Sequence, residues 1–120
     1  MLQHVLRANA VSCALFGALF VFAGPATAEF VGTPPVLLLQ FLGAGLLVNA
    51  AALVWTSMRE QPDRLSVLAF ALGDFIWVMA TAVILIGGFW ITTPSGIAWA
   101  ICVAIFVGAC GALQWKLAPR

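Results

Sequence analysis

Charged residues are scarce in this chain, and their scarcity decides the class of protein. They make up 8% of its 120 residues, whereas 64% are hydrophobic and the mean hydropathy is +1.14. Soluble domains carry about 25% charged residues, so water is not the solvent in which this chain folds. Five basic and four acidic residues form no basic patch or acidic tail, which excludes nucleic acid as a partner.

Metal-binding and cofactor-binding residues are equally few. Cys13, Cys102 and Cys110 all lie in apolar runs, outside any CxxC or Cys/His array, and we interpret them as small packing residues. The single histidine, His4, lies near the N-terminus, whereas a b-type haem between helices needs two axial side chains from within the spans. We therefore expect no metal ion and no cofactor.

The residues needed for catalysis are also missing. No Ser/His/Asp set, Cys/His set or pair of carboxylates can be assembled from the sequence. The segments between apolar runs are too short to hold a soluble active site. We therefore expect that the chain is not an enzyme.

What the sequence does contain is four long apolar runs, at residues 8–23, 34–57, 65–89 and 94–117. A helix of about 20 apolar residues crosses a hydrocarbon core of about 30 Å. The short connections make consecutive helices antiparallel neighbours. The sequence therefore predicts one integral membrane domain over residues 1–120, an all-α, transmembrane four-helix bundle with up-down-up-down order.

The basic residues predict the orientation of this bundle. All five fall on one side of the predicted spans, and the opposite connections, 25–33 and 90–93, contain none. Lysine and arginine are retained on the cytoplasmic side, so we expect both termini there, in a bacterial inner membrane. The basic residues are Arg7, Arg59, Arg64, Lys116 and Arg120.

The first run has a second interpretation. Arg7, an apolar stretch and Ala26-Thr27-Ala28 before Glu29 are typical of a cleaved signal peptide, which would leave three spans. Asn9 and Ser12 suit a helix that packs against others better than a signal sequence. We therefore expect a retained first span.

Asp74 is the only ionisable residue deep within a predicted span, about 15 Å beyond Arg64 along the helix. An acid at that depth costs about 2.5 to 3.5 kcal/mol on insertion scales, so it should face the bundle interior and have a partner. Asn49 lies as far before the turn near Pro62 as Asp74 lies after it. We predict a hydrogen bond between Asp74 and Asn49, which either stabilises the fold or belongs to a proton or cation site, the structural role being favoured.

Two further sets of residues are candidates for contacts between helices. Asn9 and Gln114 lie near the cytoplasmic ends of the first and last spans, where we expect them to cap the bundle together. The last span also carries a ridge of small residues at four-residue spacing, which serves either packing within the bundle or docking of another subunit. The ridge consists of Ala100, Ala104, Gly108 and Ala112.

Three short motifs carry a resemblance. Asn9-Ala10 in the first span, Asp74-Phe75-Ile76-Trp77-Val78 in the third and Gln114 near the end resemble small, uncharacterised four-span bacterial integral membrane proteins. The likeness covers most of the chain. It implies the four-span fold and no known activity.

Two functions remain open from the sequence. We expect first a non-enzymatic accessory, structural or assembly subunit, because catalytic chemistry is missing and the last span carries the small-residue ridge. The alternative is a small oligomeric transporter or channel that uses Asp74. The expected partners are the lipid bilayer and either another membrane protein subunit or a second copy of the chain.

Overall fold

Five α-helices make up most of the chain in the computed structural model, which describes residues 1–119. Four are long and apolar enough to cross a membrane, and within the described residues no strand forms, so the prediction of an all-α membrane protein with four spans is confirmed. The long helices are α1 (Leu2–Phe22), α3 (Val36–Ser57), α4 (Arg64–Gly87) and α5 (Pro94–Leu117). The short helix α2 (Gly24–Val31) follows α1.

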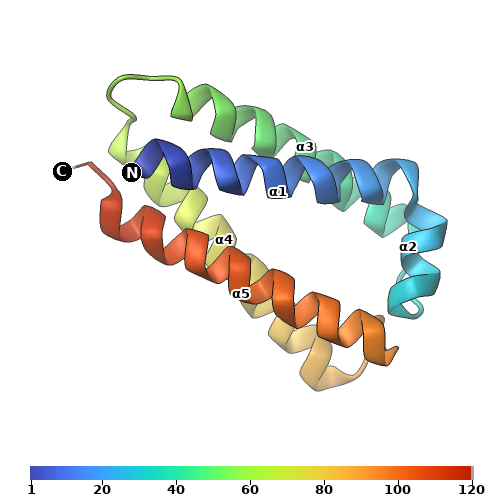
Figure 1. Ribbon diagram of the computed structural model, residues 1–120. Coiled ribbons are helices and arrows are strands. Elements are labelled where there is room, and N and C mark those ends of the chain that lie inside the picture. The colour runs from blue at the N-terminus through green and yellow to red at the C-terminus, as the bar shows by residue number, and fades with distance from the viewer. Residues whose placement is uncertain (120) are drawn as a thin grey trace.

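The long helices alternate in direction along the chain (Figure 1). Both ends of the described chain lie at one end of the molecule, together with the connection between α3 and α4 (Figure 1). The helix α2 and the connection between α4 and α5 lie at the other end. We call these the terminal end and the α2 end. The up-down-up-down order therefore agrees with the prediction.

The first span differs most from its predicted bounds. The helix begins at Leu2 instead of residue 8, and a second helix replaces the expected loop after Gly24. Helix α1 ends at Phe22 as the Gly24-Pro25 pair indicates, but Pro25 occupies the first turn of α2. Proline is favoured at that position because its fixed φ suits a helix start, so the pair that ends one helix also begins the next.

The helices pack as two pairs, α1 against α3 and α4 against α5, and α1 also contacts α5. Glycine permits the closest approach in the first pair, since a Cβ at Gly17 would lie 2.9 Å from the carbonyl oxygen of Gly43. In the second pair, a Cβ at Gly111 would lie 3.0 Å from the Cβ of Asp74. The first distance is shorter than real Cβ contacts and the second is tighter than most of them, so a larger residue at either position would require its neighbours to shift.

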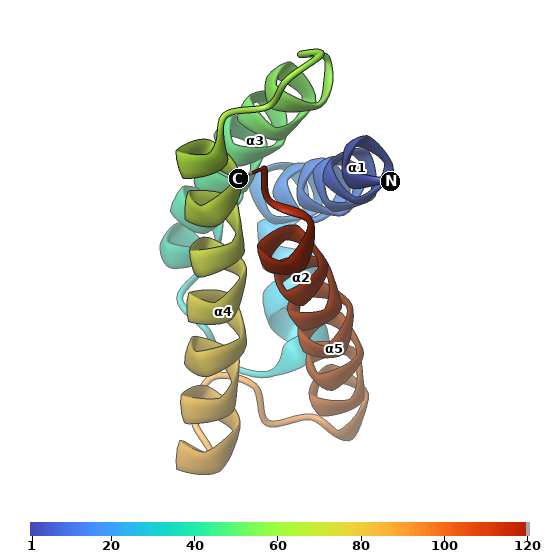
Figure 2. The same ribbon diagram turned by 90° about the vertical axis from the view of Figure 1, so that its left-hand side faces the viewer.

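The helices α3 and α4 barely touch, although they follow one another along the chain. Figures 1 and 2 show the α1/α3 pair inclined to the α4/α5 pair, so that the two pairs meet near the terminal end and separate toward α2. The expectation that all consecutive helices are packed neighbours is therefore wrong for this pair. At the end where the pairs separate, α2 contacts α1 and α3 of one pair and α5 of the other (Figure 1).

Hydrogen bonds join the two pairs at the α2 end. The amide of Thr33 donates to the carbonyl oxygen of Trp90 at 2.8 Å, and the amide of Thr92 donates to the carbonyl oxygen of Val31 at 2.8 Å. Thr93 is the N-cap of α5, as its position before Pro94 indicates, and its Oγ1 accepts from the amide of Gly96 and donates to the carbonyl oxygen of Phe30. The connection between α4 and α5 is thereby fixed to the end of α2.

Candidate functional site

Asp74 is buried where α1, α4 and α5 meet, with 6% of its surface exposed. Its Oδ2 atom accepts two hydrogen bonds, from Asn9 Nδ2 of α1 at 2.9 Å and from Gln114 Nε2 of α5 at 2.8 Å. Asn9 Nδ2 also donates to Gln114 Oε1 at 3.0 Å. We call these three residues the polar cluster. It joins the two helix pairs through side chains that are almost completely buried.

The helix faces that carry the polar cluster are built for close contact. Gly111 lies one turn before Gln114 on the same face of α5, and its missing side chain allows α5 to pass beside Asp74. Cys13 lies one turn after Asn9 on α1, and its thiol donates to Asn9 Oδ1 at 3.7 Å. The amide of Asn9 is therefore held at both its nitrogen and its oxygen.

The predicted hydrogen bond between Asp74 and Asn49 is wrong. Asn49 Nδ2 donates to the sulfur of Cys13 at 3.4 Å, and Asp74 takes its hydrogen bonds from Asn9 and Gln114. The reason is that α3 and α4 barely touch, so equal distance from their shared turn does not bring two side chains into contact. Asn49 and Asp74 do line the same cavity between the helix pairs.

Asn9 and Gln114 lie together, as their positions predict. The sequence interpretation placed them near the helix ends and Asp74 near the midplane, and so did not group the three. Counting residues from each helix end assumes that all ends are level, whereas inclined helices bring different residue counts to one depth. The three motifs that carry the resemblance contain all three residues of the polar cluster.

A cavity of about 200 Å³ lies beside the polar cluster, and we call it the polar cavity. Three of its lining residues have an oxygen with no hydrogen-bond donor within residues 1–119, namely Asp74 Oδ1, Asn49 Oδ1 and Ser12 Oγ. Every completely enclosed side-chain nitrogen or oxygen of the described residues has a partner. These three oxygens are therefore not completely enclosed, and because their side chains line the cavity, they can accept a hydrogen bond from a molecule there.

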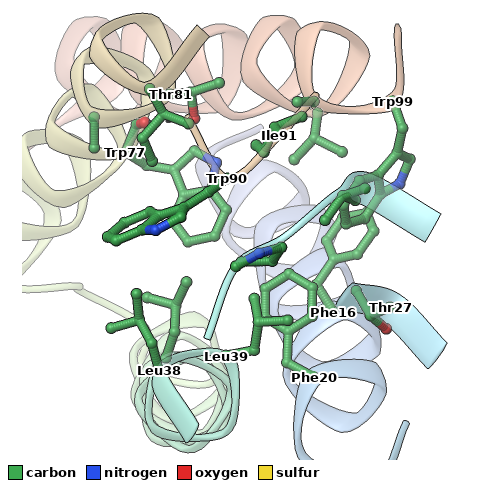
Figure 3. Close-up of a pocket in the computed structure, with 17 residues that line it drawn as sticks. Phe16, Phe20, Thr27, Leu38, Leu39, Trp77, Thr81, Trp90, Ile91 and Trp99 are labelled. Carbon is green, nitrogen blue, oxygen red and sulfur yellow. Dashed lines mark hydrogen bonds between the residues drawn. The ribbon is translucent and has the colours of Figure 1, made fainter. Parts of the chain in front are cut away.

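A second cavity of about 270 Å³ continues toward α2, and we call it the aromatic cavity (Figure 3). Phe16, Trp77 and Val103 line both cavities, so the two adjoin. Trp99 lines the aromatic cavity as well. Its ring packs edge-to-face against Phe16 and Phe20, with ring centroids 5.4 Å and 6.1 Å apart. The aromatic cavity is almost wholly apolar, in contrast to the three free oxygens beyond Trp77.

Trp90 lies at the α2 end of the aromatic cavity in an uncommon backbone conformation. Its φ is 65°, in the left-handed region that bulky residues rarely occupy. Its carbonyl oxygen accepts from the amide of Thr33, which holds this conformation, and its side chain lines the cavity. Backbone strain of this kind persists only where the surrounding structure fixes it, and it concentrates at functional sites.

The small-residue ridge of α5 is used mainly inside the chain. Ala100 is buried and lines the aromatic cavity, and a Cβ at Gly108 would lie 3.4 Å from Val78 of α4. Ala104 is half-buried and only Ala112 is exposed. Of the two interpretations left open by the sequence, the structure supports packing within the bundle for most of the ridge.

The arrangement therefore offers acceptor oxygens beside an apolar space. Within residues 1–119 no three His, Cys, Asp or Glu side chains lie close enough together to hold a metal ion. No protein-family model, curated protein or solved structure matches the chain. The likeness to small four-span bacterial membrane proteins is carried by the motifs alone.

Proposed function

We propose that the chain is a small, non-enzymatic transporter or channel that takes up a proton or cation at Asp74. The observation that carries this proposal is the difference in hydrogen bonding between the two carboxylate oxygens of Asp74. Oδ2 receives both hydrogen bonds that Asp74 accepts, whereas Oδ1 has no donor within the described residues, and Asp74 is one of the residues that line the polar cavity. A carboxylate that served structure alone would gain from a donor at each oxygen, because an unpaired oxygen in an apolar setting costs free energy.

The rest of the cavity supports the same role. The side chains of Asn49 and Ser12 also line the polar cavity and add two acceptor oxygens, and α3 and α4, which both line it, barely touch. Ionisable residues inside membranes mark ion and proton paths more often than ordinary packing sites. One chain supplies only a cleft, so the proposal includes self-association to complete a path.

We expect purified chain in lipid vesicles to carry a flux of protons or monovalent cations that Asp74→Asn abolishes. The amide keeps the shape of the side chain and removes its charge. Glu29→Gln is the matched control, since Glu29 is an exposed acid of α2 outside both cavities, and it should leave the flux unchanged. Equal flux through the Asp74→Asn variant and the unchanged chain would remove Asp74 from the mechanism.

An accessory subunit is the second candidate, and one observation favours it. The face of α4 toward the open cleft carries the small residues Ala69, Gly73 and Ala80, and a Cβ at Gly73 would meet nothing within 4 Å. Small residues allow a helix from another protein to approach closely. Crosslinking after mild solubilisation should then recover a stoichiometric partner through this face, and a clean monomer would contradict this candidate.

The proposal places the protein in the bacterial inner membrane with the terminal end in the cytoplasm. The support is the position of the basic residues, since Arg59 lies in the connection at this end and Arg64 and Lys116 lie in the adjoining turns of α4 and α5. The α2 end lacks lysine and arginine. This distribution follows the positive-inside rule.

A further inference from the structure

Trp77 lies at the junction of the two cavities, one helical turn after Asp74 on the same face of α4. It is one of three residues that line both the aromatic cavity and the polar cavity. Tryptophan is the aromatic side chain that attracts cations most strongly. A cation in the polar cavity would therefore share that cavity with the type of aromatic side chain that attracts cations best.

The three free oxygens match a particular kind of cation. A primary ammonium group has three N–H donors and no acceptor, and three side chains that line the polar cavity each have an oxygen that lacks a donor within the described residues. A small inorganic ion must have its hydration shell replaced by a fuller set of oxygens. Such an ion would also leave the adjoining aromatic cavity without a role.

We propose that the paired cavities bind a lipophilic ammonium ion, with its charged group in the polar cavity between Asp74, Asn49 and Ser12 and its hydrocarbon or aromatic body in the aromatic cavity. This proposal rests on the proposed function, since it names the class of cation taken up at Asp74. Charge complementarity selects a cation over a neutral lipid: Asp74 is 6% exposed, and its described hydrogen-bond partners, Asn9 and Gln114, are both neutral. The apolar lining around Trp99, Phe16 and Phe20 selects an organic body.

The cleft also gives such a molecule a route of entry. Residues of α3 and α4 line the aromatic cavity, and because these helices barely touch, the side of the cavity between them faces the region that lipid occupies around a membrane protein. Amphiphilic amines concentrate in that region, with the body among lipid tails and the charge at the headgroups. Binding then moves the charge inward to the only carboxylate within the long helices.

The test measures equilibrium binding of 4-phenylbutylammonium to the chain in lipid nanodiscs, beside the neutral analogue 4-phenylbutanol and the quaternary analogue 4-phenylbutyl-trimethylammonium. We expect the primary ammonium to bind at least tenfold more tightly than the alcohol. The quaternary ion lacks N–H donors and should bind more weakly than the primary ammonium. Equal binding of ammonium and alcohol would overturn the proposal and identify the cleft as a plain hydrocarbon site.

Two substitutions with matched controls locate the site. Asp74→Asn should remove the preference for ammonium over alcohol, and Glu29→Gln should keep it. Trp77→Leu should weaken ammonium binding about fivefold or more and leave the alcohol little changed. Trp115→Leu, which replaces an exposed tryptophan of α5 outside both cavities, should change neither.

Asn49→Leu keeps the proposal testable if the Asp74→Asn variant does not fold, because Asn49 is only half-buried. Loss of its side-chain oxygen should weaken the binding of the primary ammonium more than the binding of the quaternary ion. Full retention of the ammonium preference in the Trp77→Leu and Asn49→Leu variants would contradict the assigned site. An Asp74-dependent flux of protons or sodium without ammonium binding would overturn this inference and leave the proposed function standing. If the chain showed neither an Asp74-dependent flux nor ammonium binding, this inference and the proposed function would both be overturned.

Discussion

Replacing Asn9 by leucine is expected to lower the free energy of unfolding in detergent micelles by about 2 to 3 kcal/mol. The change removes one of the two donors to Asp74 Oδ2 and the one described donor to Gln114 Oε1, and both acceptors belong to buried residues. Gln114 Oε1 then has no donor within the described residues, which costs about 1 to 3 kcal/mol while it stays buried, whereas Asp74 Oδ2 keeps the hydrogen bond from Gln114 Nε2 and loses about 1 kcal/mol with the other. Thermal unfolding followed by circular dichroism measures the effect.

Asn49→Leu is the matched control for this experiment. Asn49 is half-buried, and its one hydrogen bond as donor goes to the sulfur of Cys13, a weak acceptor. We expect a loss below about 1 kcal/mol, in the range of an ordinary hydrogen bond between membrane helices. A larger loss for Asn49→Leu than for Asn9→Leu would contradict the polar cluster.

Replacing Gly17 by leucine is expected to force α1 and α3 apart and to destabilise the fold by about 3 kcal/mol or more. A Cβ at this position would lie 2.9 Å from the carbonyl oxygen of Gly43, which is backbone and cannot turn aside. The pair α1/α3 forms the most extensive helix contact in the structure, so its separation also disturbs the core around Leu6 and Leu53. The same unfolding measurement applies.

Gly45→Leu controls for the loss of a glycine from α3. A Cβ there would meet nothing within 4 Å, and leucine forms helix better than glycine by up to about 1 kcal/mol. We expect unchanged or slightly raised stability. If Gly17→Leu were as stable as Gly45→Leu, the close crossing of α1 and α3 would be wrong.

The four long helices could be predicted from the sequence because a long apolar segment can cross lipid only if its backbone N–H and C=O groups are hydrogen-bonded within a helix. Local rules also predicted individual helix ends: Pro94 begins α5 with Thr93 as its N-cap, and the Gly24-Pro25 pair follows the end of α1. The same rules missed α2, because a proline that follows a helix end is read as a loop when it can equally begin a new helix. Apolar patterns gave no signal for the inclination of the helix pairs.

The candidate site could be predicted only in part. The burial of Asp74 follows from the cost of exposing an acid to lipid, and this part of the prediction agrees with the structure. Its partners do not follow, because the choice among Asn9, Asn49 and Gln114 depends on which helices touch. Sequence spacing predicted that Asn49 lies at the depth of Asp74, and both residues do line one cavity, but spacing could not show that α3 and α4 barely touch.

The most direct test of the polar cluster is a pair of double-mutant cycles on the stability of the detergent-solubilised protein. One cycle combines Asn9→Ala with Asp74→Ala, and the other combines Asn49→Ala with Asp74→Ala. Direct hydrogen bonding between Asn9 and Asp74 predicts a coupling free energy of about 1 kcal/mol in the first cycle and a value near zero in the second. Coupling between Asn49 and Asp74 with none between Asn9 and Asp74 would contradict the site described for this protein.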